Sequence, residues 1–249
     1  MKNTNYSKIA GHYDKNPIRH HQPKELLIEE ILRVTDSSIN ILDIACGTGN
    51  FLKAQQEAYT DKRIKWFGCD LSQEMLAIAH KKVSHVEFIK ANAVKLPYKN
   101  NSFNFITCNY AFHHFFDKYK SIQEIYRILK PNGAFLIKNM CLEHMPLSWI
   151  YYYFPQTKRI DRRRFWSNQK LFSILEEIGF KVDIKVEVFY KRFDINEITN
   201  EAENRDMSQL NLISDKKYNK GMKRIHKDMK LINSLISEFA NLRCVAFKA

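Results

Sequence analysis

The sequence ILDIACGTGN, Ile41 to Asn50, is the most informative part of this chain for its fold. An apolar run followed by Gly47 and Gly49 is typical of a buried strand that ends in a tight turn, because glycine lets the backbone turn sharply and approach a ligand closely. A dinucleotide site needs a third glycine where Leu52 stands, and a triphosphate site needs a Gly-Lys-Ser/Thr sequence that does not follow. The turn therefore predicts a ligand site, but not a pyrophosphate site.

Segments with the apolar pattern of strands alternate with segments of helical period around this turn. Pro23 and Ser72 suit helix starts, because proline fits the first helical turn and a serine side chain caps the backbone. We predict helices over 23–34, 51–59, 72–82 and 119–130, and strands over 39–45, 64–70, 86–93, 103–112 and 133–140. This order is typical of a doubly wound α/β fold with a parallel sheet.

The pattern changes after residue 140. Residues 141–170 are aromatic and basic without a clear period, and residues 194–240 have a polar, helical character. Between them, a helix over 168–178 ends at Gly179, and residues 180–190 alternate like a half-exposed strand. Residues 241–249 are predicted to form the last strand.

Composition limits the class of protein. A chain of 249 residues with 45% hydrophobic residues is long enough for one folded domain with a buried core. Its five cysteines are scattered without a Cys-x-x-Cys pair, which predicts buried thiols rather than disulfides or a metal site. The polar N-terminus lacks the apolar segment of a signal peptide, and no apolar run reaches membrane-spanning length, so we expect a cytoplasmic protein without a membrane span.

The formal net charge of +13 raises the question of a nucleic-acid partner. The excess is spread over the chain, whereas a groove for phosphates would concentrate it on one face, which argues against nucleic acid. The densest basic run fits a solvated surface with Asp161 as partner, a site for a carboxylate or phosphate, or an RNA contact. It consists of Lys158, Arg159, Arg162, Arg163 and Arg164. The sequence leaves the oligomeric state open.

An acidic residue, Asp70, ends the second predicted strand in the sequence FGCD. In a doubly wound sheet, ligands bind at the carboxyl ends of the strands, where the strand order reverses. A carboxylate at such a strand end is suited to accept hydrogen bonds from both hydroxyls of a ribose. The glycine turn and Asp70 together predict a ligand that has a ribose but need not have a pyrophosphate.

Four motifs, in this order, resemble the class I S-adenosylmethionine-dependent methyltransferases, most closely the type 11, UbiE-like small-molecule group. They are LDIACGTGNF for the glycine loop, DLSQEML for the acidic strand end, ANAVKLPYKNNSFNFITCNYAFHHF for the adenine-side loop and fourth strand, and EIYRILKPNGAFLI before the fifth strand. The resemblance covers residues 1–140, and LFSILEEIGFKV is a weaker match. It implies an S-adenosyl-L-methionine cofactor and a small-molecule acceptor.

The resemblance also implies an architecture, a Rossmann-like α/β fold with a seven-stranded, mostly parallel sheet whose last strand is antiparallel. We predict a single methyltransferase domain over 1–249. Within it we expect an N-terminal helical lid (1–40), a cofactor-binding core (41–140), two cap insertions over the acceptor site (141–170 and 194–240) and the C-terminal part of the sheet (171–193 and 241–249).

Cofactor-binding roles follow from the resemblance, residue by residue. The lid over the cofactor carboxylate would include Tyr13 and Arg19, and the methionine portion would lie beside Asp43, Gly47 and Gly49. The ribose would bind to Asp70, and the adenine would lie beside Leu71, Met75, Asn92 and Ala93. The methyl group would lie beside Asn109.

Three residues depart from the family pattern. Ala45 stands where the family usually has a glycine, Asn92 where an aspartate is commoner, and Asn132 where the family has the first glycine of PGG. A methyl group at Ala45 is tolerated if φ is negative there, and Asn92 can still accept a hydrogen bond through its amide carbonyl. These departures affect the expected affinity for the cofactor more than the identity of the fold.

Methyl transfer from a sulfonium is an in-line displacement, so a base is needed only if the acceptor must lose a proton. The candidates for this role are His114 and Tyr13, while His113 fits packing against the next helix better. The sequence predicts a small-molecule acceptor, aromatic if Tyr151–Tyr153 line its pocket rather than the core, or anionic if the basic run binds it. The alternatives are an RNA-directed methyltransferase and a cofactor-binding protein without catalysis.

Overall fold

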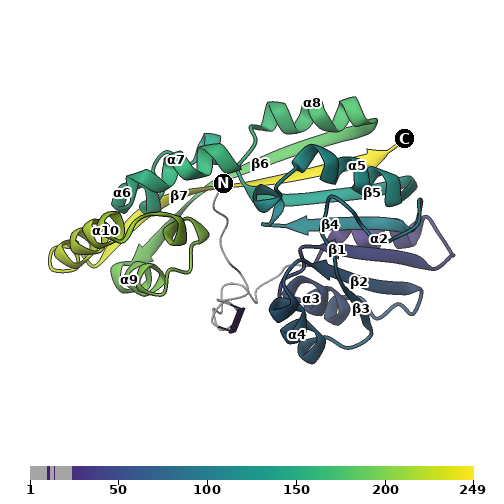
Figure 1. Cartoon of the computed structure of the whole chain (residues 1–249), viewed down its shortest axis with the longest axis horizontal. Helices are drawn as coiled ribbons and strands as arrows, with labels where there is room; N and C mark the ends of the chain where they lie inside the picture. The colour runs from purple at the N-terminus through teal and green to yellow at the C-terminus, as the bar shows by residue number, and fades with distance from the viewer. Residues whose placement is uncertain (1–9, 12–13, 15–23) are drawn as a thin grey trace. The chain divides into compact units, whose positions relative to one another are not determined.

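The structure, a computed structural model, describes residues 10, 11, 14 and 24–249. Seven strands form one sheet in the order β3-β2-β1-β4-β5-β7-β6 (Figure 1). The neighbours from β3 to β5 pair in parallel, as the alternation of strands and helices predicts. The strands are β1 (Ile39–Ile44), β2 (Ile64–Asp70), β3 (Val86–Lys90), β4 (Phe103–Asn109), β5 (Leu129–Met140), β6 (Phe180–Asp194) and β7 (Ser234–Lys248).

The last strand runs antiparallel to β5. The N–H of Cys141, directly after β5, donates to the carbonyl of Ala240 within β7 at 2.8 Å. The Lys248 ammonium at the end of β7 donates to the carbonyl of Leu129, where β5 begins, also at 2.8 Å. Strand β7 therefore returns along β5, and the predicted Rossmann-like sheet of mostly parallel strands is confirmed.

Helices flank the parallel strands at the places that the sequence predicts. Ser72 caps α4 by accepting a hydrogen bond from the Met75 N–H at 3.2 Å, and Gly179 ends α8 with φ at +111°. Buried residues of α2, α3 and α4, among them Ile28 and Leu52, form one core with β1. The helices are α2 (Leu26–Arg33), α3 (Asn50–Ala58), α4 (Gln73–Lys82), α5 (Lys118–Ile128) and α8 (Asn168–Ile178).

The strand order places the glycine turn where the sheet reverses direction. From β1 the chain proceeds outward through β2 to β3 and then returns to β4, on the other side of β1. Right-handed connections put the helices of the two halves on opposite faces, which opens the carboxyl ends of β1 and β4 to a ligand. The loops that follow Ile44 and Asn109 therefore meet at this edge of the sheet.

The described chain divides into two compact units. One comprises the described residues up to Asn139 together with Phe172–Ile184 and Arg243–Ala249, and it contains the glycine turn. The other comprises Met140–Leu171 and Lys185–Leu242, so it takes in both stretches that the sequence predicts as cap insertions. A role of this second unit as a cap over the acceptor site stays a prediction.

The second unit has more regular structure than its sequence predicts. Residues 141–170, which show no clear period, form helices on either side of Phe154, and the second of them begins at Pro155. A proline suits the first turn of a helix but ends the helix before it. Because the segment forms two short helices instead of one long helix, its apolar residues do not follow a single helical period. Strand β7 also begins at Ser234, inside the stretch predicted to be helical. The helices of this unit are α6 (Trp149–Tyr153), α7 (Pro155–Arg164), α9 (Ile195–Glu203) and α10 (Asp215–Asp228).

The tyrosines of α6 belong mainly to the core of the second unit. Tyr151 and Tyr153 are buried in a cluster with Ile198 and Ile225, whereas the side chain of Tyr152 is exposed. Two of the three tyrosines considered for an aromatic acceptor pocket, Tyr151 and Tyr153, are therefore core residues.

One cation of the basic run is buried, and the other four are exposed or half-buried. The Arg164 guanidinium donates to Asp161 Oδ1 at 2.5 Å, and the Tyr151 hydroxyl donates to Asp161 Oδ2 at 3.0 Å. Arg164 and Asp161 are both buried, whereas Arg162 and Arg163 lie on the surface. Of the interpretations of this run, the pairing with Asp161 is the one that the structure shows for Arg164.

Two expectations from composition can be compared with the structure. All five cysteines are buried, as their scattered positions predict. None of the helices in the described part of the chain combines the length and the apolar character that a membrane crossing needs.

Candidate cofactor and acceptor site

The glycine turn after β1 uses left-handed backbone conformations. Gly47 has φ at +55° and Gly49 has φ at +79°, a region that glycine adopts without strain. A Cβ atom at Gly47 would meet open space, so the backbone there is accessible to a ligand. A Cβ atom at Gly49 would instead lie 3.0 Å from Val83 Cγ2 and 3.2 Å from Ala79 Cβ. Gly49 is thus required by packing against α4, and Gly47 is the glycine that faces the open side.

Ala45 also adopts a left-handed conformation, with φ at +56°. A negative φ, the condition under which the methyl group would be tolerated without strain, is therefore not met. An L-residue with a Cβ atom pays about 1–2 kcal/mol in this region. Strain of this kind is typical of residues that a functional loop holds in place.

Ala45→Gly is expected to raise the free energy of unfolding by up to about 1 kcal/mol, because the relief of strain exceeds the added entropy of the unfolded chain. Thermal and urea unfolding, followed by circular dichroism, measure the change. Ala54→Gly inside α3 is the matched control and should destabilise the protein by about 1 kcal/mol. A loss of stability in both variants would contradict the strain assigned to Ala45.

Asp70 joins the glycine turn to the start of α4. Its Oδ2 accepts a hydrogen bond from the Gly47 N–H at 2.9 Å, and its Oδ1 accepts one from the Ser72 N–H at 2.8 Å. Burial raises the pKa of Asp70, and these N–H donors act in the opposite direction. Each carboxylate oxygen has two lone pairs, so both oxygens keep acceptor capacity for a ribose.

A buried polar cluster lies beneath the turn, at the ends of β1 and β4. Asp43 Oδ1 accepts hydrogen bonds from Thr107 Oγ1 at 2.6 Å and from Asn109 Nδ2 at 3.2 Å. Desolvation raises the pKa of Asp43 to about 7. The Asn109 Oδ1 atom is buried and accepts no hydrogen bond from any described residue. A buried carboxylate beside an unsatisfied acceptor fits a cationic donor such as an ammonium.

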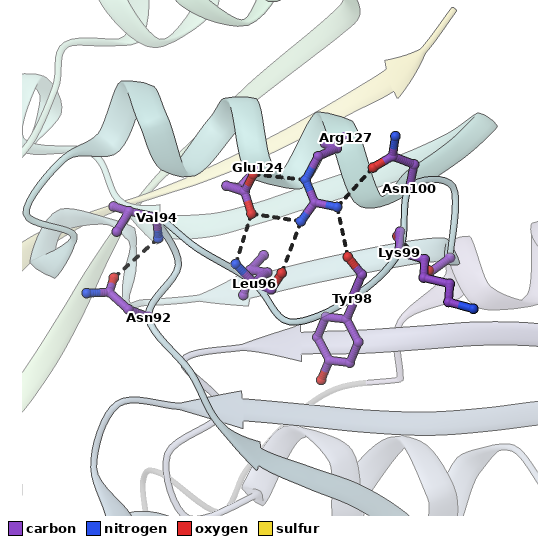
Figure 2. Close-up of polar contacts among 9 residues, drawn as sticks. Asn92, Val94, Leu96, Tyr98, Lys99, Asn100, Glu124 and Arg127 are labelled. Atoms are coloured by element: carbon purple, nitrogen blue, oxygen red, sulfur yellow. Dashed lines mark hydrogen bonds and ion pairs between the residues drawn. The ribbon is translucent and has the colours of Figure 1, made fainter.

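The adenine-side residues differ in how the structure presents them. Leu71 follows Asp70 with 64% of its surface exposed, whereas Met75 on α4 is only 2% exposed. Leu71 is thus the side chain of this pair that lies at the surface. Asn92 is exposed, and its Oδ1 already accepts the Val94 N–H at 3.2 Å (Figure 2), while Ala93 is half-buried.

The end of β4 carries a feature that the sequence did not single out. Tyr110 directly follows Asn109, has φ at +52° and is 43% exposed. A bulky residue with positive φ is uncommon, and such outliers gather at functional sites. Its N–H donates to the carbonyl of Lys138 at 2.7 Å, which fixes the turn. No sequence signal marks a tyrosine for this conformation, because tyrosine has no intrinsic preference for it.

The two histidines lie on the short 3-10 turn Phe112–His114 that follows. His113 is buried and its Nδ1 lies 3.2 Å from Asn139 Oδ1. His114 is half-buried, and the two rings have centroids 3.9 Å apart. His113 is therefore buried beside Asn139 of β5, and His114 is the more accessible of the two.

Lys82 is a residue of the site that sequence reasoning missed. Its ammonium donates to Asn50 Oδ1 at 2.6 Å and to Thr48 Oγ1 at 3.3 Å, and it also pairs with Asp14. Thr48 and Asn50 belong to the glycine turn, so this cation at the end of α4 ties the turn in place. The predicted lid residues Tyr13 and Arg19 lie outside the described residues.

Comparison with known proteins agrees with this geometry. Residues 42–137 match the family described as a methyltransferase domain. The chain is 29% identical over 186 residues to a demethylmenaquinone methyltransferase of Bacillus mycoides, with 69% of this chain and 76% of the relative aligned. It is 32% identical over 151 residues to the ubiquinone/menaquinone biosynthesis C-methyltransferase UbiE of Rickettsia prowazekii, with 57% and 59% aligned.

Solved structures share the fold. The YcgJ protein of Bacillus subtilis aligns over 90% of this chain and 97% of its own, with a TM-score of 0.59 at 20% identity. A phosphoethanolamine N-methyltransferase 2 of Haemonchus contortus, in complex with S-adenosylhomocysteine, aligns over 90% of this chain and 52% of its own, with a TM-score of 0.55 at 23% identity.

The family match covers the glycine turn, Asp70 and the end of β4, the elements that build the site. Residues 42–137 thus match a methyltransferase domain, and the chain is similar to demethylmenaquinone and UbiE methyltransferases over more than half of its length.

Proposed function

We propose that this methyltransferase acts on a small aromatic acceptor at the carboxyl ends of β1 and β4. The observation that carries the proposal is the exposed ring of Tyr110, held at positive φ directly after Asn109. An aromatic ring gains by stacking against a planar molecule. Phe116, in the same loop, is 91% exposed and adds apolar surface. Quinone-type acceptors in the names of two relatives are of this class.

We propose that four residues at this edge hold the cofactor. Asp70 would accept from the ribose hydroxyls, the backbone at Gly47 would lie against the methionine portion, and Asp43 with Asn109 would face its ammonium. When bound, the cofactor supplies a methyl group on a sulfonium, which an acceptor atom takes by in-line displacement. The protein's own task is to hold that acceptor atom in line and to exclude water.

His114 is the proposed proton acceptor for a substrate that must lose a proton. It is more accessible than His113 and lies on the turn that follows Tyr110. Imidazole is suited to this task because it changes charge near neutral pH. Tyr13, the other candidate base, lies outside the described residues.

The proposal does not include an acidic group on the acceptor. Arg164 pairs with Asp161 inside the second unit, so the basic run offers only its exposed members to any ligand. The proposal does not include an RNA substrate, because the positive charge is spread along the sequence rather than concentrated in one segment.

Tyr110→Ala is expected to raise the KM for the acceptor by about tenfold, because the variant loses one aromatic contact with it. The affinity for S-adenosylhomocysteine should stay unchanged. The assay follows labelled methyl transfer to a panel of naphthoquinols, catechols and phenols, with small amines and total RNA as comparison substrates. Tyr119→Ala on α5 removes another partly exposed tyrosine and serves as control.

Three outcomes decide the proposal. Turnover of an aromatic acceptor with a selective effect of Tyr110→Ala supports it. Turnover of amines or RNA alone would contradict it. Binding of the cofactor without turnover of any acceptor would favour a cofactor-binding protein without catalysis.

A further inference from the structure

We propose that Glu124 and Arg127 of α5 are positioning residues for the adenine end of the cofactor, acting through the loop between β3 and β4. This inference rests on the proposed cofactor site and on the assignment of that loop to the adenine, which the family resemblance implies. The loop runs from Ala91 to Ser102, and neither side chain of the pair belongs to it. Figure 2 shows both side chains directed from α5 onto the loop.

Arg127 uses all five N–H donors of its guanidinium. Nε donates to Glu124 Oε1 at 2.9 Å, and Nη2 donates to Glu124 Oε2 at 2.8 Å and to the Leu96 carbonyl at 3.0 Å. Nη1 donates to the Tyr98 carbonyl at 2.8 Å and to Asn100 Oδ1 at 3.0 Å. One planar group thus fixes three points of the loop, which only an arginine fork can do.

Glu124 also contacts the loop directly, as a hydrogen-bond acceptor. Its Oε2 accepts the Leu96 N–H at 2.9 Å, in addition to its two bonds with Arg127 (Figure 2). Leu96 therefore has both its N–H and its carbonyl bound to the pair. The pKa of Glu124 is lowered, first by its hydrogen bond to Arg127, so the pair keeps its charges at neutral pH.

Most of the other polar contacts lie near the ends of the loop. At its start, the Ala91 N–H donates to the carbonyl of Asp70 at 3.0 Å, and the Lys95 N–H donates to the carbonyl of Asn92 at 2.9 Å. At its end, the Asn101 N–H donates to the carbonyl of Arg127 at 3.0 Å. Between these turns, the pair supplies most of the polar contacts of Leu96–Asn100. The Ser102 hydroxyl adds one by donating to the Lys99 carbonyl at 2.6 Å.

The start of the loop is the part that would meet the adenine. Asn92 and Ala93 follow β3, beside the backbone of Asp70 and therefore beside the proposed ribose contact. A displacement of the loop at Leu96 would shift these two residues, because only a short turn separates them. The pair would therefore affect the recognition of the amino edge of the base without touching it.

Arg127→Met is the test, because methionine keeps much of the apolar stem and removes every donor. Titration calorimetry would measure the affinities for S-adenosylhomocysteine and for its inosine analogue, which replaces the amino group of adenine with a carbonyl. We expect the variant to bind S-adenosylhomocysteine about tenfold more weakly and to lose most of the preference for adenine. Its kcat at saturating cofactor should change by no more than about twofold.

The controls separate positioning from stability. Arg33→Met removes a similar arginine, which pairs with Glu29 at 2.8 Å on the surface of α2, and it should leave both affinities unchanged. Arg127→Lys keeps the charge but not the fork, so it should fall between the wild type and Arg127→Met. Hydrogen exchange at the Leu96 amide should speed up in Glu124→Ala, because its acceptor is gone.

The outcomes distinguish the pair from the site itself. A wild type that binds both ligands equally would overturn the adenine assignment of the loop. A wild type that prefers adenine, with Arg127→Met keeping the same preference, would overturn the positioning role. A loss of preference that appears in Arg127→Met and not in Arg33→Met is the result we expect.

Discussion

Asp70→Ala is expected to weaken binding of S-adenosyl-L-methionine by about 30- to 1,000-fold, which corresponds to about 2–4 kcal/mol. The variant loses a carboxylate proposed to accept from both ribose hydroxyls. It also releases the Gly47 and Ser72 N–H groups, so the glycine turn loses its tie to α4. Titration calorimetry with S-adenosylhomocysteine measures the loss, with circular dichroism to verify that the variant is folded.

The ribose contact can be separated from the ordering of the turn. A 2′-deoxy analogue of S-adenosylhomocysteine should bind the wild type more weakly than the parent ligand, whereas Asp70→Ala should bind both about equally. Asp61→Ala is the matched control, because Asp61 accepts a backbone N–H from Arg63 at 2.9 Å before β2 begins. If Asp70→Ala still penalises the deoxy ligand as the wild type does, Asp70 does not hold the ribose.

The framework of the site could be predicted from local patterns. Alternating apolar periods fix the strands, and the carboxyl end of each strand follows from where the pattern stops, which locates Gly47, Asp70 and Asn109. These positions come together because parallel strands end at one edge of a sheet. The sequence signal is strong here because each feature is encoded within a few neighbouring residues.

Features that depend on distant contacts could not be predicted in this way. Ala45 and Tyr110 hold positive φ although neither residue favours it, because the surrounding fold imposes the conformation. Lys82 and Arg127 look like surface charges in the sequence, and only the fold brings them to the glycine turn and the adenine-side loop. The buried pair of Arg164 and Asp161 shows the same limit, since a charge run by itself does not reveal which member is buried.

Asp43→Asn is expected to weaken cofactor binding at pH 8 by about 2–5 kcal/mol, because it removes a buried charge proposed to face the ammonium. The amide still accepts from Thr107 Oγ1, so the fold should survive. Titration calorimetry at pH 8 measures the loss. Thr107→Val, which removes a hydrogen bond to Asp43 but keeps the charge, is the control and should have a smaller effect.

The same residue predicts how binding depends on pH. The pKa of Asp43 is raised to about 7, mainly by burial and to a smaller extent by the charge of Asp70. The hydrogen bonds from Thr107 and Asn109 and the charge of Lys138 act in the opposite direction. Below a pH of about 7, the Asp43 carboxyl group of the free protein carries a proton. This proton must leave before Asp43 can form an ionic contact with an ammonium. Affinity should therefore fall by up to about tenfold for each pH unit below 7, and it should level off above 7. Folding has the opposite dependence, since the raised pKa makes stability fall as pH rises from about 4 toward 7.

Calorimetry in buffers of different ionisation enthalpy tests this linkage, because it counts the protons released on binding. The wild type should release close to one proton per ligand at pH 6 and almost none at pH 8. Asp43→Asn should release none at either pH and should bind with a nearly constant affinity across this range. Asp70 also has a raised pKa, so a release that persists in Asp43→Asn would assign the proton to Asp70 or to the histidines after β4 instead. A persistent release would leave Asp43 as a structural acceptor for Thr107 and Asn109, with no charged contact to the ligand.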